Sequence, residues 1–265
     1  MDRTEKYLEA LDLRAGEPSA AFLAELIVRH QRTFAFTSIG PQLGAVLPLA
    51  PDAVFDRVVV QRRGGYCFEH NLLLFEALRD LGYSCRLIMA RVILRTDDAP
   101  LDHRITLVNL PDADVIADVG MGWPAPFAPV PMSGDVVGND WRSFRIRELQ
   151  PGHWTMQTSR GEDWRPLYRF ELYEYTDLDC EIAHEHTSRH PDSQFVQFLI
   201  ASQSSPAEIR SLRESTYQVI TADGTEETEV QDAAALRALL REEFSTRVDS
   251  AEAVQLWEQV QARRG

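Results

Sequence analysis

The apolar positions of the first 83 residues recur at the spacing of amphipathic helices. Tyr7 and Leu11 belong to one apolar face, and a second helix follows a break that ends at Ser19. We predict Ser19 and Asp52 as helix N-caps, because a Ser or Asp side chain can accept a hydrogen bond from the first helical turn. Residues 34–39 are predicted to be extended, and the helix after Asp52 is expected to lead into Val58.

The most strongly apolar helix is predicted between residues 67 and 82. Its apolar residues lie almost all round, so we expect this helix to be buried. From residue 85 the pattern changes to that of strands, which predicts an antiparallel barrel or sandwich. The predicted strands cover residues 85–94, 103–110, 115–119, 142–149, 153–158, 164–173 and a piece around 181–183. A long loop rich in Pro and Gly occupies residues 120–139.

The last third of the chain shows both helical and strand patterns. A helical piece begins near residue 187, with Asp192 or Ser193 as its cap, and residues 216–230 read as a hairpin with a turn at Asp223 and Gly224. Two acidic helices follow, at 233–244 and 251–262. The chain is therefore predicted to have an α+β fold with three domains. They are a helical bundle (1–83), a β-barrel (84–190), and an interdomain helix with an α/β lid (191–265).

Charge and composition exclude some classes of function. The net charge is −14 and the isoelectric point is about 4.9, which argues against a surface that binds nucleic acid. No apolar stretch approaches the roughly 18 residues of a membrane span, and the N-terminus has no secretory core. Three cysteines in no disulfide framework fit a reducing cytosol, so we expect a cytoplasmic protein. As a separate expectation, the chain is a monomer or homodimer.

Cys67 is the first candidate for chemistry. Gly64 and Gly65 allow a sharp turn, and Cys67 then begins the buried helix, where the helix dipole favours a negative charge. We therefore expect a lowered thiol pKa. A buried cysteine more often only packs, but the density of polar neighbours here favours a functional thiol. These neighbours are Arg62, Arg63, Glu69, His70 and Asn71.

His103 and Asp118 are the candidate base and its orienting group. His103 opens one predicted strand and Asp118 lies near the end of the next, with a turn at residues 111–114 between them. In such a hairpin the two residues are expected almost opposite each other, as a cross-strand pair. The carboxylate would hold one ring nitrogen and leave the other for the thiol.

Metal binding is the alternative for the cysteines and histidines. Cys67 and His70 could ligate zinc together with Cys85 or His103, but a second close pair at zinc spacing is lacking. His184 and His186 would share one face of a strand and could hold a metal near Cys180 and His190. Solvated or polar-core histidines are the preferred interpretation. We therefore predict no metal site.

Several segments together resemble the arylamine N-acetyltransferases. Residues 63–71 (RGGYCFEHN) are similar to the family's R-G-G-x-C-x-E-x-N segment around the catalytic cysteine. His103 matches the family's histidine, and residues 118–122 (DVGMG) resemble its D-V-G-F-G segment with the aspartate. Further similarity lies at residues 7–9, 165–170 and 187–195. The resemblance implies a helical bundle, a β-barrel and an α/β lid, with a papain-like Cys-His-Asp triad.

The resemblance also implies a reaction. Cys67 would attack acetyl-CoA, and an arylamine, arylhydroxylamine or hydrazine would then take the acetyl group in a ping-pong mechanism without a bound cofactor. His103 would move the protons and Asp118 would fix its tautomer. Substrate contacts are expected from Phe36, Tyr66 and Met121. Support of the site is expected from Arg63, Glu69, Asn71, Gly120 and Gly122.

Two departures from the family pattern, and one additional carboxylate, bear on the site. Residues 35–38 (AFTS) replace the usual Pro-Phe-Glu-Asn, which removes a carboxylate expected at the cleft, and Met121 replaces a phenylalanine. Asp102 adds a carboxylate beside His103. These departures concern the acceptor half of the reaction. The alternatives are a macrolactam-forming amide synthase of the same family, a thiol amidohydrolase and a binding protein with an inactive triad.

Overall fold

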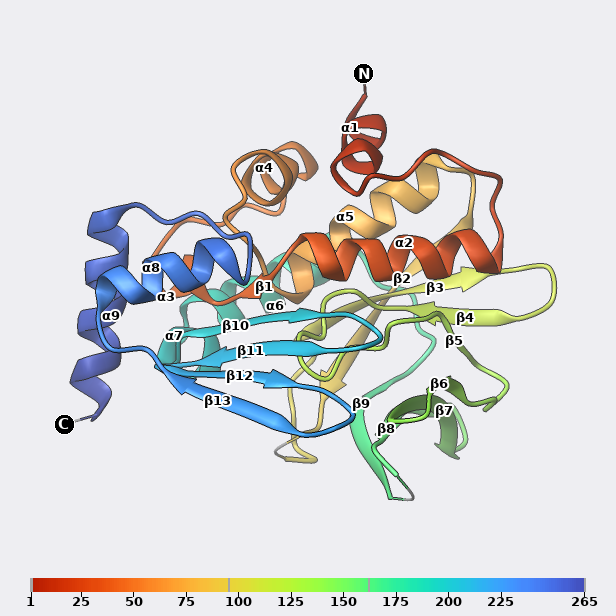
Figure 1. Cartoon of the computed structure of the whole chain (residues 1–265). Coiled ribbons are helices and arrows are strands. Elements are labelled where there is room, and N and C mark those ends of the chain that lie inside the picture. The colour runs from red at the N-terminus through yellow and green to blue at the C-terminus, as the bar shows by residue number, and fades with distance from the viewer. Residues whose placement is uncertain (1, 95, 162, 265) are drawn as a thin grey trace.

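Two antiparallel sheets and a group of N-terminal helices organise the molecule (Figure 1). The computed structural model describes residues 2–94, 96–161 and 163–264. One sheet has eight strands in the order β5-β4-β3-β2-β9-β8-β7-β6, and the other has five in the order β1-β10-β11-β12-β13. The N-terminal helices lie along one side of both sheets (Figure 1).

The N-terminal helices follow the predicted apolar pattern. Ser19 is confirmed as an N-cap, since its hydroxyl accepts a hydrogen bond from Phe22 N (3.2 Å). The prediction for Asp52 is wrong, because the helix begins at Pro51, whose fixed φ suits the first helical position. Ile39 begins a short helix and is not extended. The helices are α1 (Arg3–Ala10), α2 (Ala20–Thr33), α3 (Ile39–Gln42), α4 (Pro51–Phe55) with a π-helical turn at Asp56–Val60, and α5 (Cys67–Asp80).

The eight-stranded sheet curls into a nearly closed barrel, because β5 at one edge lies against β7 near the other. Its inner face is packed with buried apolar side chains, among them Ile88, Phe144 and Met156. The predicted loop at 120–139 contains two of the short strands. The strands are β2 (Ser84–Val92), β3 (His103–Asn109), β4 (Asp114–Ala117), β5 (Val130–Pro131), β6 (Val137–Asn139), β7 (Arg142–Gln150), β8 (His153–Ser159) and β9 (Trp164–Phe170).

The strand predicted around residues 181–183 is wrong, because this segment lies inside helix α6 (Asp177–Arg189). Thr176 and Asp179 form a capping box, in which Asp179 Oδ2 accepts from Thr176 N (2.7 Å). On a helix, His184 and His186 point in very different directions, so they do not share a face as predicted. Among the described residues, no group of His, Cys, Asp and Glu is arranged to hold a metal ion.

The C-terminal part contains a second sheet that the sequence predicted only in part. Ser193 caps the short helix α7 (Gln194–Gln197), and the hairpin of β12 (Thr216–Ile220) and β13 (Thr225–Glu229) is confirmed. The predicted helical piece extended to residue 203, but residues 200–203 belong to a strand, because this segment pairs with strands on both sides. The other elements are β10 (Ile200–Ser204), β11 (Ile209–Arg213), α8 (Ala233–Glu242) and α9 (Ser250–Arg264).

Strand β1 (Phe36–Thr37) joins distant parts of the chain. It pairs with β10 through Phe36↔Ser202 and Thr37↔Ala201, and Phe36 also forms a bridge to Gly65. A strand from the N-terminal helical region thus completes the C-terminal sheet. The domain boundaries after residues 83 and 190 stay predictions. No helix in the described ranges is both long and apolar enough to cross a membrane.

Candidate active site

Cys67 lies at the first position of α5, as predicted. The loop before it is held by Glu69, whose carboxylate accepts from Tyr66 N (2.9 Å). Gly64 adopts a positive φ of 69°, and a Cβ there would lie 2.6 Å from Thr37 Oγ1. Only glycine fits this turn, and the turn aims Cys67 toward the barrel strands.

The thiol of Cys67 is almost completely buried, at 3% exposure, and its Sγ lies 3.5 Å from Asp102 O. Burial raises the pKa of this thiol well above its usual value, and the carboxylates of Asp102 and Asp118 raise it further. Hydrogen bonds with the backbone of Arg104 and Phe68 offset only part of this rise in the pKa. The predicted lowering is therefore wrong, because burial and two nearby carboxylates outweigh the helix N-terminus.

His103 and Asp118 are in contact, with Nε2 2.8 Å from Oδ2. They are not directly opposite, however. The last pair of the β3–β4 register is Thr106↔Ala117. Continuing the register by one residue places Asp118 opposite Ile105. His103 is therefore a diagonal neighbour on the same face, two residues farther along the strand.

Asp118 is held as a carboxylate. Asn71 Nδ2 (2.9 Å) and Gly120 N (2.8 Å) both donate to its Oδ1. Burial alone would raise the pKa of Asp118, but the charge of His103 and these hydrogen bonds outweigh burial, so the pKa is lowered. An acceptor-only carboxylate requires the proton on His103 Nε2, which leaves Nδ1 as the free acceptor of the neutral ring.

Gly120 and Asn71 hold the segment around Asp118 against Cys67. A Cβ at Gly120 would lie 2.6 Å from Asn71 Nδ2 and 2.7 Å from Cys67 Cα. Asn71 Oδ1 accepts from Val119 N (3.0 Å). One amide side chain therefore bonds both to the carboxylate of Asp118 and to the backbone of the next residue. A Cβ at Gly122 would lie 3.1 Å from the Phe36 ring. These close approaches pack the segment that follows β4 against the start of α5 and against β1.

Arg63 and Glu69 anchor the loop before Cys67. Arg63 Nη1 and Nη2 donate to the two carboxylate oxygens of Glu252 on α9 (2.7 and 2.5 Å). Glu69 accepts from Arg57 Nε (2.6 Å). Neither side chain lines the cleft that contains Cys67. Their role in supporting the site stays a prediction.

A cleft of about 740 Å³ contains Cys67 and His103. Phe36 and Met121 line it, and their contact with substrate stays a prediction. Tyr66 does not, because it is fully buried and its hydroxyl bonds to His184 Nδ1 (2.6 Å). Thr37 also lies outside this cleft and lines a separate cavity.

Several lining residues were missed by the sequence reasoning, namely Trp123, His190, Phe195, Ser202, Ser211 and Arg213. Phe195 and His190 belong to the segment 187–195 that carried part of the resemblance, so a signal existed for them. The strand residues come from β10 and β11, whose position depends on long-range pairing.

The family described as N-acetyltransferase matches residues 20–254 of this chain. An arylamine N-acetyltransferase of Mycobacterium tuberculosis is 34% identical over 251 residues, which cover 91% of this chain and 88% of that protein. The chain belongs to the arylamine N-acetyltransferase family. The resemblance of its motifs to that family is thereby confirmed.

Solved structures of arylamine N-acetyltransferases share the fold. The enzyme of Mycobacterium marinum, solved in complex with CoA, is 28% identical with a TM-score of 0.90, and the match covers 97% of this chain and 98% of that one. The enzyme of Salmonella typhimurium is 25% identical with a TM-score of 0.92 over the same shares. The predicted α+β fold class is confirmed by these similarities.

A chain of buried hydrogen bonds supports α5 behind the cleft of this family member. Tyr7 Oη is 2.6 Å from His30 Nδ1, and His30 Nε2 is 2.8 Å from His70 Nδ1. His70 Nε2 faces two carbonyl oxygens, of Ala35 and Gly65, at 3.1 Å each, so it must donate. Every proton position follows in turn: His30 donates to His70, and Tyr7 donates to His30. Burial lowers the pKa of both histidines, which agrees with neutral rings.

Proposed function

We propose that this chain transfers an acetyl group from acetyl-CoA to arylamines, arylhydroxylamines or hydrazines through an acetyl-Cys67 intermediate. The proposal rests on a cleft of about 740 Å³ that both Cys67 and His103 line, with His103 Nε2 lying 2.8 Å from the buried Asp118 Oδ2. The family membership supports the choice of donor and acceptor.

In the first half-reaction the resting thiol is protonated, because its pKa is raised. His103 Nδ1 takes this proton as Cys67 Sγ attacks the thioester carbonyl. The C–S bond to CoA then breaks, and the proton passes from His103 to the departing CoA sulfur. Asp118 stabilises the imidazolium between these steps, since its lowered pKa keeps it ionised. One thioester replaces another, so this half-reaction is close to isoenergetic.

In the second half-reaction an amine nitrogen attacks the acetyl carbon on Cys67. His103 Nδ1 accepts the amine proton and returns it to the departing sulfur. Phe36 and Met121 supply the apolar wall against which an aromatic acceptor can pack. Asn71 and Gly120 act by holding Asp118.

Intact-protein mass spectrometry tests the intermediate. Mixing the protein with acetyl-CoA should add one acetyl group, mapped to Cys67, and an aromatic amine should remove it as the acetylated amine appears. Cys67→Ser should lose the burst of free CoA, and the matched variants Cys85→Ser and Cys180→Ser should keep it. Amine acetylation without a Cys67 adduct would overturn the mechanism. Rapid loss of the adduct in water without amine would favour the amidohydrolase.

We place this reaction in a reducing cytoplasm, because Cys67, Cys85 and Cys180 are all free thiols. A monomer or homodimer is our proposal for the assembly. Light scattering over a range of protein concentrations distinguishes these two states from larger oligomers.

A further inference from the structure

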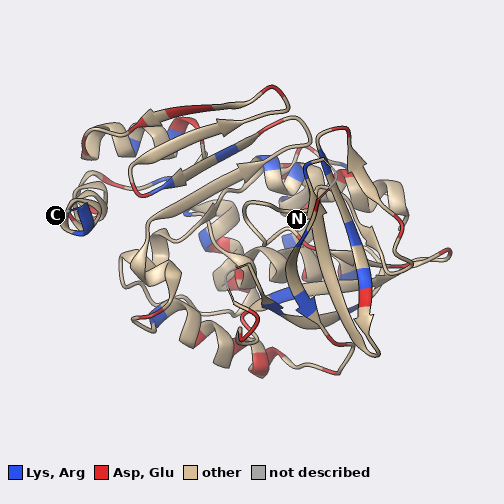
Figure 2. Ribbon diagram, turned by 90° about the horizontal axis from the view of Figure 1, so that it is seen from below, with Lys and Arg blue, Asp and Glu red and all other residues tan. Residues whose placement is uncertain are grey.

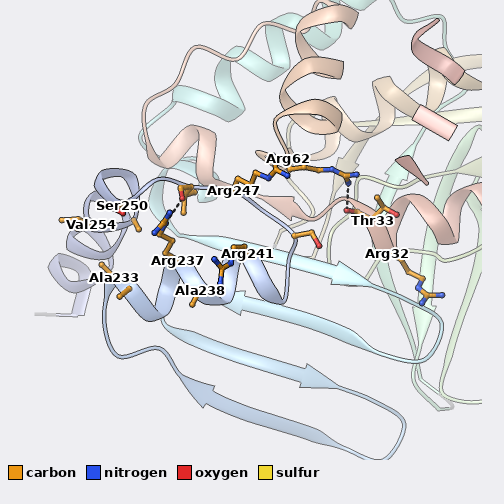
Figure 3. A pocket seen from close by; sticks show the side chains of 14 residues that line it. Arg32, Thr33, Arg62, Ala233, Arg237, Ala238, Arg241, Arg247, Ser250 and Val254 are labelled. Carbon is orange, nitrogen blue, oxygen red and sulfur yellow. Dashed lines mark hydrogen bonds between the residues drawn. The ribbon is translucent and has the colours of Figure 1, made fainter. Parts of the chain in front are cut away.

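A second large cleft lies between the C-terminal helices and the end of α2. Its volume is about 1110 Å³, above the roughly 300–1,000 Å³ of common ligand pockets. It shares no lining residue with the cleft of Cys67. Figure 3 shows Arg237 and Arg241 projecting from α8 and Arg62 on the opposite side. Five arginines line this cleft: Arg32, Arg62, Arg237, Arg241 and Arg247.

The positive charge of this arginine cleft is weakly compensated. Within the described part of the chain, no ion pair or side-chain hydrogen bond involves the guanidinium groups of Arg32 and Arg247. Arg62 and Arg237 donate to backbone carbonyls, of Thr33 (3.3 Å) and Val248 (3.1 Å). Arg241 pairs with its neighbour Glu242 at 2.7 Å, but both side chains are exposed, so that pair contributes little.

Apart from Glu242, three acidic residues near the cleft have partners outside it. Asp232 caps α8 by accepting from Ala235 N (2.8 Å), and Asp249 accepts from Glu252 N (2.9 Å). Glu252 itself pairs with Arg63. Asp and Glu occur over the whole molecule (Figure 2), yet none lines this cleft among the residues described. A group of five cations in a chain of net charge −14 therefore departs from the average surface.

Two of these cations, Arg62 and Arg247, repel each other. Burial lowers the pKa of Arg62, and the nearby charge of Arg247 lowers it further. An anion placed between them would remove this repulsion. Guanidinium groups bind phosphate through two parallel hydrogen bonds, and the hydroxyls of Thr33, Ser245 and Ser250 add donors at the walls.

We propose that the arginine cleft binds a small molecule that carries two or more phosphate groups, of the condensed-phosphate type. The other lining side chains are alanines and valines, and no aromatic ring among the lining residues could stack on a base. The cleft therefore recognises charge and phosphate geometry, whereas nucleotide bases usually stack on rings. It is a site for a ligand other than the acetyl donor and the amine acceptor.

Calorimetric titration of the whole protein with sodium tripolyphosphate tests this proposal. Binding should occur below about 1 mM, weaken with added salt and raise the melting temperature of the protein. Arg32→Gln and Arg247→Gln should each weaken it by about tenfold, since each removes a charge-assisted contact. Arg165→Gln makes the same change of charge on the exposed part of β9 and should leave binding unchanged.

Three results would each overturn the proposal. The first is equal binding to the cleft variants and to the Arg165 control. The second is equal affinity for polyglutamate, which would indicate an acidic peptide as the ligand. The third is displacement of tripolyphosphate by CoA together with a raised KM for acetyl-CoA in the cleft variants, which would assign the cleft to the donor. Acetylation of Cys67 is measured separately, so failure here leaves the proposed function standing.

Discussion

Gly120→Ala should slow acetylation of Cys67 by about 10²-fold. The new Cβ would lie 2.7 Å from Cys67 Cα, whereas carbon atoms pack best at about 3.5–4.0 Å, so the two segments must separate by roughly 1 Å. Both contacts are with fixed groups, the backbone of α5 and the amide of Asn71, so relaxation must move the Asp118 segment. A displacement of about 1 Å in a catalytic constellation costs on the order of 10²-fold in rate, and overpacking costs about 1–3 kcal/mol of stability.

Single-turnover release of CoA measures the effect, at a temperature where circular dichroism shows the variant folded. Gly16→Ala is the matched control, because its Cβ would meet the Phe22 ring at an ordinary 3.4 Å. The control should acetylate at the wild-type rate. A folded Gly120→Ala protein with the wild-type rate of acetylation would refute the claim that this close approach positions the His103–Asp118 pair.

Other predictions concern the carboxylate, the acceptor wall and the buried histidines. Asp118→Asn should keep the fold but lower kcat by about 10⁴, as in another triad, and near-normal turnover would show that the carboxylate does not orient the base. Met121→Phe should change the relative rates of aromatic amines and hydrazines in the second half-reaction and leave acetylation of Cys67 unchanged. Single-turnover kinetics of each half-reaction measures both rates, and slower acetylation with unchanged amine selectivity would contradict the prediction. The pKa values of His30 and His70 are lowered, so the unfolded chain binds more protons below about pH 6.5 and the free energy of unfolding should fall between about pH 7 and 5. Thermal melts should show His30→Gln flattening this dependence, and the exposed His153→Gln should not; equal slopes in both variants would contradict the assignment.

Local patterns predicted the elements whose partners are close in sequence. The apolar surface of α5 is a property of its own residues, and its start at Cys67 was correctly placed. The strand predicted around residues 181–183 was wrong because the capping box of Thr176 and Asp179 went unnoticed. Residues 200–204 were missed for another reason. A short apolar run fits helix or strand equally, and pairing with Thr37 and with β11 decides between them.

The candidate site also has features that local spacing predicts and features that it does not. His103 and Asp118 lie on neighbouring strands of one hairpin, so their contact could be predicted from spacing, although the register differed by two residues. The burial of Tyr66 and the raised pKa of the Cys67 thiol could not be predicted from local spacing. Both depend on how tightly distant elements cover the start of α5. No local pattern carries that information.

The pairing of β1 with β10 has a consequence for biosynthesis. Ser38 bonds to Phe198 O across 160 residues, and Phe36 bridges this sheet to Gly65 in the loop before Cys67. At a synthesis rate of about 5–20 residues per second, the ribosome needs roughly 10–30 s to supply the missing strand. For roughly the last 4–16 s of this interval, after Asp118 has been made, the nascent chain contains Cys67, His103 and Asp118, but the loop that presents the thiol still lacks its sheet. A truncated chain that ends before residue 200 should therefore carry Cys67, His103 and Asp118 and acetylate nothing.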